Sequence, residues 1–110
     1  MPSAEAAAPL FAALADPTRL ALLRRLADGE PRPIVALAAG SALTRQAVTK
    51  HLAVLRGAGL VARRPAGRET LYALRPEGLA EARTWLDEIA GQWDDALSRL
   101  KPHVEDPAVR

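Results

Sequence analysis

The segment IVALAAGSALTRQAVTKHLAVLRG, residues 34–57, has the outline of two helices joined by a tight turn. Residues 34–39 predict a short helix, and the small residues GSA that follow predict the turn. Thr44 is a suitable cap for a second helix that runs to about Arg56, where glycine residues end it. The order of short helix, tight turn and longer helix predicts a helix-turn-helix over about residues 34–56.

The longer helix has an apolar face and a polar face. Val48, Leu52 and Leu55 recur at helical spacing, so this face is expected to pack against the preceding helices. The opposite face carries an amide, a hydroxyl, an ammonium and a guanidinium, the groups that read base edges and phosphates in a major groove. The residues expected to contact DNA from this helix are Thr44, Arg45, Gln46, Thr49 and Lys50. For each of these residues taken singly, the alternative is a place on an ordinary solvated helix face. His51 fits either a hydrogen bond between helices or a phosphate contact.

Two short strands are expected after the helix-turn-helix. Leu60 and Val61 predict the first, residues 70–74 predict the second, and RPAGR at residues 64–68 predicts the connection. A basic-tipped hairpin at this place, about residues 60–75, is typical of a wing. The side chains expected to anchor phosphates, with one at the tip suited to the minor groove, are Arg63, Arg64 and Arg68. A turn that is merely solvated is the alternative.

Charge is distributed unevenly along the chain. The 110 residues carry 15 Lys and Arg against 13 Asp and Glu, which gives a formal net charge of +2. Residues 44–75 hold seven basic side chains and one acidic side chain, Glu69, whereas residues 77–110 hold four basic and eight acidic ones. A basic segment that coincides with the helix-turn-helix and the wing favours a polyanion as its partner.

Helices are also expected at both ends of the domain. The first covers residues 4–15, and the second begins with the Asp16 cap and Pro17 and ends before Gly29. A last long helix over about residues 77–100 has apolar residues at alternating spacings of three and four. Because this helix is longer than the domain beneath it, we expect the first and last helices to pair with a second copy, which places two recognition helices about 34 Å apart. Packing on the protomer's own core is the alternative. The expected dimer-interface residues are Leu10, Phe11, Leu14, Leu79, Ala82, Leu86, Ile89, Trp93, Ala96 and Leu100.

Length and composition narrow the class of protein. The chain suffices for a single domain, expected over residues 1–104, with a frayed tail at residues 105–110. The 49% hydrophobic and 25% charged residues are typical of a soluble globular protein, and 4% aromatics predict an aliphatic core. Since the sequence has no cysteine, no Gly-rich phosphate loop and no interpretable pairing of serine or carboxylate with histidine, we expect neither enzyme activity nor a cofactor. With no bilayer-spanning run and no signal peptide, we expect a cytoplasmic protein.

The ordered motifs resemble those of the ArsR/SmtB family of bacterial winged helix-turn-helix repressors. The resemblance covers roughly residues 10–100 and rests on AALADPTRLALL (12–23), LTRQAVTKHLAVL (43–55), AGLV (58–61), and the pairs GR (67–68) and LY (71–72). It implies a mainly helical fold with a small β-hairpin, in the order helix, helix, helix, helix, strand, strand, helix. It also implies a homodimer through the first and last helices that binds an operator and blocks transcription until a signal releases it. The DNA contacts it implies are those already named. Ser41 and Ala42 depart from the family's usual turn residues, so the turn is expected to differ slightly in shape.

The metal ligands of the family's metal sensors are missing from this sequence. The short helix at residues 34–38 has no thiol, and the last helix has carboxylates but no histidine before His103. We therefore expect a signal other than a metal. A site near Trp85 and Trp93 for a small molecule or partner is one hypothesis, and simple core filling by these tryptophans is the alternative. The alternatives for the whole chain are a winged-helix protein-interaction module and a metal-responsive repressor with an atypical site.

Overall fold

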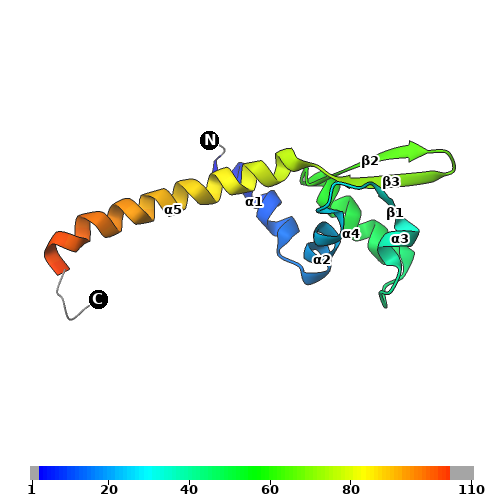
Figure 1. Ribbon diagram of the computed structural model, residues 1–110, viewed down its shortest axis with the longest axis horizontal. Helices are drawn as coiled ribbons and strands as arrows, with labels where there is room; N and C mark the ends of the chain where they lie inside the picture. The colour runs from blue at the N-terminus through cyan, green and yellow to red at the C-terminus, as the bar shows by residue number, and fades with distance from the viewer. Residues whose placement is uncertain (1–2, 105–110) are drawn as a thin grey trace.

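The structure is a computed structural model that describes residues 3–104. It is mainly helical, with one small antiparallel sheet (Figure 1). In chain order the elements are α1 (Ala4–Leu14), α2 (Pro17–Leu26), β1 (Arg32–Pro33), α3 (Ile34–Ala38), α4 (Arg45–Gly57), β2 (Val61–Ala66), β3 (Glu69–Leu74) and α5 (Pro76–Val104). The predicted series of four helices, hairpin and long final helix is confirmed. The tail at residues 105–110, which was expected to fray, lies outside the described residues.

The sheet has three strands in the order β1–β3–β2, where the sequence predicted only a two-stranded hairpin. The additional strand consists of Arg32 and Pro33, which pair with Tyr72 and Leu71 of β3. Two residues are too few to show the alternating pattern by which a strand is recognised in a sequence. Strand β1 nevertheless joins the start of α3 to the wing, so the helix-turn-helix and the hairpin share one framework.

The wing is longer, and its turn is tighter, than predicted. Strands β2 and β3 remain paired as far as Ala66 and Glu69, which leaves only Gly67 and Arg68 in the turn. Gly67 has a φ of 64°, a conformation that suits glycine in a two-residue hairpin turn. Pro65 was predicted to lie in the turn, but it lies in β2. An edge strand accepts proline because one side of that strand has no hydrogen-bonded neighbour.

An aliphatic core holds α4 in place. Val48, Leu52 and Leu55 of α4 are at most 1% exposed, which confirms the predicted inward face of this helix. They belong to one cluster with Leu26 of α2 and Leu37 of α3. Burial of each of these leucines stabilises the fold by roughly 1.5–3 kcal/mol. The cluster therefore fixes which face of α4 is left to solvent.

Side-chain caps set where α2 and α4 begin, as predicted. The Asp16 carboxylate accepts hydrogen bonds from the backbone N–H groups of Arg19 (3.0 Å) and Thr18 (2.8 Å). The bond from Arg19 has the largest effect on the pKa of Asp16. Both bonds lower this pKa because they favour the ionised carboxylate. The Thr44 hydroxyl accepts a hydrogen bond from the N–H of Ala47 at 3.0 Å. Both caps explain why the two helices begin where the sequence indicated.

Helix α5 dominates the shape of the molecule. It runs for 29 residues, about 43 Å, and its carboxyl half extends beyond the other elements (Figure 1). The molecule measures 64 × 29 × 22 Å. The start of α5 packs directly on the turn between α4 and β2, where a Cβ on Gly78 would overlap the carbonyl oxygen of Gly59.

Two residues predicted for the dimer interface lie inside the protomer instead. Leu10 of α1 is 5% exposed and Ala82 of α5 is 6% exposed, and both belong to the core cluster. The reason is that α1 packs on the first half of α5, where Phe11 meets Trp85 edge to face with a ring-centroid distance of 5.9 Å. The large apolar side chains of α5 that remain exposed are Leu79, Leu86, Ile89, Trp93, Leu97 and Leu100.

Candidate nucleic-acid interface

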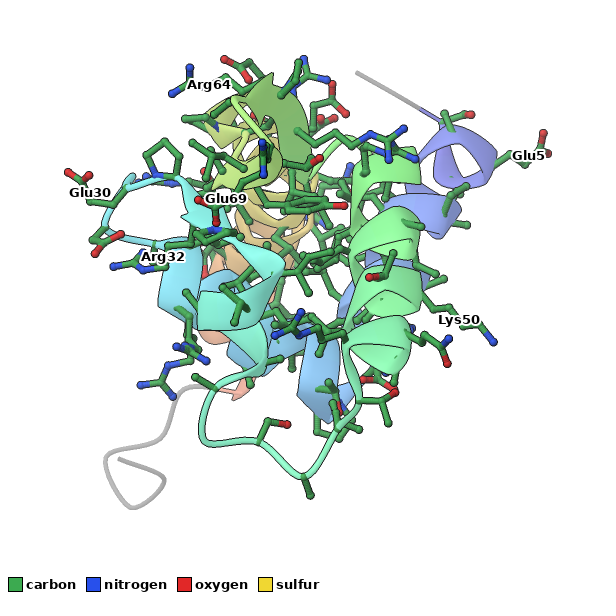
Figure 2. All side chains as sticks on the ribbon, turned by 90° about the vertical axis from the view of Figure 1, so that its right-hand side faces the viewer. Glu5, Glu30, Arg32, Lys50, Arg64 and Glu69 are labelled. Carbon is green, nitrogen blue, oxygen red and sulfur yellow. The ribbon has the colours of Figure 1, made fainter. Side chains whose placement is uncertain are left out.

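The polar face of α4 is open to solvent. Arg45, Gln46, Thr49 and Lys50 are all exposed, and Gln46 and Lys50 lie on the side of α4 opposite its buried face. Figure 2 shows Lys50 pointing away from the molecule. A duplex could not approach these side chains if the rest of the protomer covered them. The structure leaves this face accessible to a partner that admits one helix, as a major groove does.

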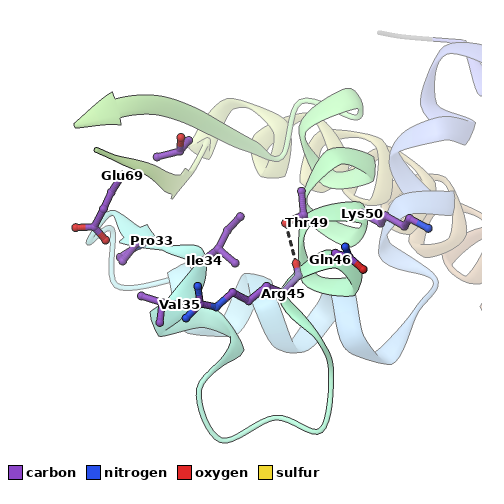
Figure 3. A pocket seen from close by; sticks show the side chains of 9 residues that line it. Pro33, Ile34, Val35, Arg45, Gln46, Thr49, Lys50 and Glu69 are labelled. Carbon is purple, nitrogen blue, oxygen red and sulfur yellow. Dashed lines mark hydrogen bonds between the residues drawn. The ribbon is translucent and has the colours of Figure 1, made fainter. Parts of the chain in front are cut away.

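The two threonines of this face differ in hydrogen-bonding capacity. The Thr44 oxygen accepts from Ala47, so its hydroxyl proton is free to be donated to a phosphate. Thr49 donates its proton to the carbonyl oxygen of Arg45 at 2.8 Å (Figure 3), so its oxygen can only accept. While that bond is made, the oxygen cannot bind a phosphate oxygen. It matches an amino group at a base edge, and the threonine methyl fits that of thymine.

A groove of about 800 Å³ lies between α4 and the hairpin (Figure 3). It is lined by Pro33, Ile34, Val35, Arg45, Gln46, Thr49, Lys50, Glu69 and Thr70. The four exposed residues of α4 therefore share one surface. The Arg45 side chain extends toward Val35 on the first turn of α3. The residues contributed by α3 and β3 were not predicted, because the groove brings together segments that are far apart in the sequence.

The three arginines of the wing do not gather on one face. Arg63 and Arg64 are successive residues of β2, where they lie opposite Tyr72 and Leu71 of β3. Successive side chains in a strand point to opposite faces of the sheet. Arg68 lies in the turn at the tip, and all three arginines are exposed, as Figure 2 shows for Arg64. Arg63 and Arg64 therefore point to opposite faces of the hairpin, and Arg68 lies at its tip.

Two further arginines, which the sequence analysis did not single out, link the end of α2 to the segments that follow it. Arg25 in the last turn of α2 donates hydrogen bonds to the carbonyl oxygens of Ala36 (2.7 Å) and Leu37 (2.8 Å) in α3. A helix as short as α3 leaves its carbonyls without internal partners, and a cation satisfies them. Arg32 forms an ion pair with Asp28 at 2.7 Å, which holds the pKa of that carboxyl well below its usual range.

His51 forms a contact between helices. Its Nδ1 lies 3.3 Å from Nη1 of Arg19, which belongs to the first turn of α2. Of the two roles that the sequence left open for His51, the structure supports the hydrogen bond between helices.

Metal ligands and membrane spans were searched for within residues 3–104. No three His, Cys, Asp or Glu side chains in this part of the chain lie where they could hold one metal ion. No single helix there is long and apolar enough to cross a membrane, and α1 with α2 reaches that composition only as a pair bent by 86°.

Comparison with known proteins gives relatives for most of the chain. A family model described as a helix-turn-helix domain matches residues 14–64. The HTH-type transcriptional regulator Rv2034 of Mycobacterium tuberculosis is 48% identical over 86 residues, which cover 78% of this chain and 77% of that protein.

Solved structures share the fold as well. An ArsR-like transcriptional regulator from Rhodococcus sp. RHA1 has a TM-score of 0.79 at 34% identity, over 93% of this chain and 95% of that chain. The homodimeric winged helix-turn-helix DNA-binding domain Mb0332 of Mycobacterium bovis has a TM-score of 0.64 at 27% identity, over 80% of this chain and 81% of that one. The fold and the open face of α4 define a winged helix-turn-helix DNA-binding regulator. The chain belongs to the ArsR/SmtB family of transcriptional regulators, which are DNA-binding proteins.

Proposed function

We propose that this chain binds a two-fold-symmetric operator as a homodimer and represses transcription until a signal releases it. The observation that carries the proposal is the exposure of Gln46 and Lys50 on a helix whose other face is completely buried. A helix held in this way presents its polar side chains in one orientation, as recognition of base edges requires. The unit that binds is one winged helix-turn-helix domain, residues 1–104, acting in the cytoplasm.

In the proposed complex α4 lies in the major groove. Gln46 suits a bidentate contact with adenine, and Arg45 suits one with guanine. Lys50 neutralises a phosphate, and Thr44 donates its hydroxyl to another at the amino end of α4, where the helix dipole favours an anion. Thr49 accepts from a base amino group. The wing adds phosphate contacts through Arg68 and, depending on which face of the hairpin meets the duplex, through Arg63 or Arg64.

The proposed dimer uses the apolar stripe of α5. Six large apolar side chains of α5 are exposed, and an exposed stripe of this size usually marks an interface. A second copy is the partner that fits, because the Mycobacterium bovis domain of the same fold is homodimeric. With Leu10 and Ala82 assigned to the protomer core, the residues proposed for the interface are Phe11, Leu14, Leu79, Leu86, Ile89, Trp93, Ala96 and Leu100.

The proposed release signal is not a metal. The chain has no cysteine, and the described part of α5 offers carboxylates, which alone bind transition metals poorly. Trp93 is 61% exposed, whereas Trp85 is half-buried and packs edge to face on Phe11. A signal that changes how the two copies of α5 cross would change the distance between the recognition helices, and with it the affinity for the operator.

Binding to a duplex from the promoter of the protein's own gene, measured by mobility shift at several salt concentrations, tests the proposal. Each phosphate neutralised contributes about −0.9 to the slope of log K against log salt. Arg68→Ala is therefore expected to weaken binding to every duplex and to reduce the magnitude of the slope by about 1. Arg99→Ala removes the same charge from an exposed site on α5 and should change neither. A slope near zero for the wild type contradicts DNA binding and favours a protein-interaction module.

A further inference from the structure

Arg19 connects three helices through one side chain. Its Nε donates to the carbonyl oxygen of Ala13 at 2.7 Å, and its Nη2 donates to that of Ala12 at 3.3 Å. Its Nη1 lies 3.3 Å from Nδ1 of His51. Ala12 and Ala13 belong to the last turn of α1, Arg19 to the first turn of α2, and His51 to the middle of α4.

The chemistry of the guanidinium suits this place. The last carbonyls of a helix have no partners within it, and a cation there is favoured by the helix dipole. Arginine always carries its charge and presents several N–H donors in a planar fork, so it can bind both carbonyls and a third acceptor at once. Because arginine has no acceptor, the guanidinium is the donor and Nδ1 of His51 the acceptor in this hydrogen bond.

The α4 end of this link lies beside the DNA-binding face. His51 follows Lys50, which is exposed on that face, and precedes Leu52, which is fully buried. A shift of His51 relative to α1 therefore moves the exposed side chains of α4 as well.

The α1 end of the link lies beside the proposed dimer surface. Phe11, directly before Ala12, packs edge to face on Trp85 of α5 at 5.9 Å. Contacts thus run without a break from Trp85 of α5 through the last turn of α1 and Arg19 to His51 of α4.

We propose that Arg19 is a positioning residue that fixes the recognition helix relative to the dimer surface, and so sets the spacing of operator half-sites that the dimer accepts. This inference rests on the proposed function, because it presumes two recognition helices in successive major grooves about 34 Å apart. Loss of the link leaves each recognition helix able to read its own half-site. The distance between the two helices is then less strictly held.

A series of operators with altered half-site spacing tests the inference. The probe is an operator selected by the wild-type protein from random duplexes, with one or two base pairs inserted or deleted at its centre. A duplex with a single intact half-site is the reference. The wild type is expected to lose about tenfold or more in affinity for each base pair of change, whereas Arg19→Ala should lose less than about threefold. Affinity for the single half-site should be the same for both. Arg24→Ala, which removes an exposed arginine from the same helix, is the matched control and should keep the wild-type spacing preference.

Variants of His51 separate positioning from folding and from a direct phosphate contact. His51→Gln keeps a side-chain acceptor for Arg19 and should retain the spacing preference, whereas His51→Leu should lose it as Arg19→Ala does. A direct phosphate contact by His51 would instead lower the affinity of His51→Leu for the single half-site. The inference is overturned if Arg19→Ala keeps the wild-type spacing preference, or if it loses single half-site affinity by the same factor as paired-site affinity. If the wild type selects no duplex at all, the proposed function itself fails.

Discussion

Replacing Gly78 by alanine is expected to destabilise the fold, although alanine is the better helix former. A Cβ on Gly78 would overlap the carbonyl oxygen of Gly59, and it would lie 2.9 Å from the carbonyl carbon of Gly59 and 3.2 Å from Cα of Leu60. All three are backbone atoms, which cannot rotate aside as the end of a flexible side chain can. Helix α5 would have to move away from the turn between α4 and β2.

The expected magnitude follows from two opposing effects. Overpacking of this kind costs roughly 1–3 kcal/mol, and alanine recovers up to about 1 kcal/mol of helix propensity. Because Gly78 lies in the first turn of α5, that recovery is small, and we expect a net loss of roughly 1–2 kcal/mol in the free energy of unfolding. At Gly91, in the same helix, an added Cβ meets nothing within 4 Å, so Gly91→Ala should gain about 0.5–1 kcal/mol.

Urea unfolding followed by circular dichroism measures both changes. All proteins are compared at one concentration, because the stability of a dimer depends on concentration. The expected order of transition midpoints is Gly91→Ala, then wild type, then Gly78→Ala. If Gly78→Ala were as stable as Gly91→Ala, the close packing of α5 on the Gly59 turn would be refuted.

Three further predictions concern the core, a helix cap and the dimer. In chemical denaturation, Leu52→Ala should lower the free energy of unfolding by about 2–5 kcal/mol because Leu52 is fully buried. The control Ala53→Ser, at the exposed neighbouring position, should change it by less than about 0.5 kcal/mol. The lowered pKa of Asp16 means that its contribution to stability is complete above the unfolded value of 3.8 and is lost as pH falls through the folded value. The difference in stability between wild type and Asp16→Asn should therefore shrink in an acid titration, and a difference independent of pH would contradict the cap. Trp93→Lys should weaken self-association by about tenfold or more in sedimentation velocity. It should not unfold the protomer, because Trp93 is 61% exposed in the single chain. Unchanged association would exclude this part of α5 from the interface.

The sequence predicted the features that depend on neighbouring residues. Asp16 before Pro17 and Thr44 before the apolar repeat are local capping signals, and the structure has both caps. The inward face of α4 followed from helical spacing alone, since apolar residues on one side of a helix must be buried together. The order of elements and the exposed polar face of α4 could be predicted for the same reason.

Features that depend on contacts between distant segments could not be predicted in this way. Strand β1 exists only because Arg32 and Pro33 meet β3, and the groove beside α4 needs residues of α3 and β3. The contacts of Arg19 and Arg25 with backbone carbonyls leave no pattern in the sequence, because a carbonyl is present at every residue. Periodicity marked Ala82 as apolar but could not tell whether its partner was α1 or a second copy.

Whether α4 reads bases is tested most directly by selecting operators from random duplexes with wild type and Gln46→Ala in parallel. The expected result for Gln46→Ala is the same symmetric site with base preference lost at one position in each half-site, and with unchanged affinity for unselected duplexes. Identical preferences at every position for the two proteins would contradict recognition of DNA through the exposed face of α4.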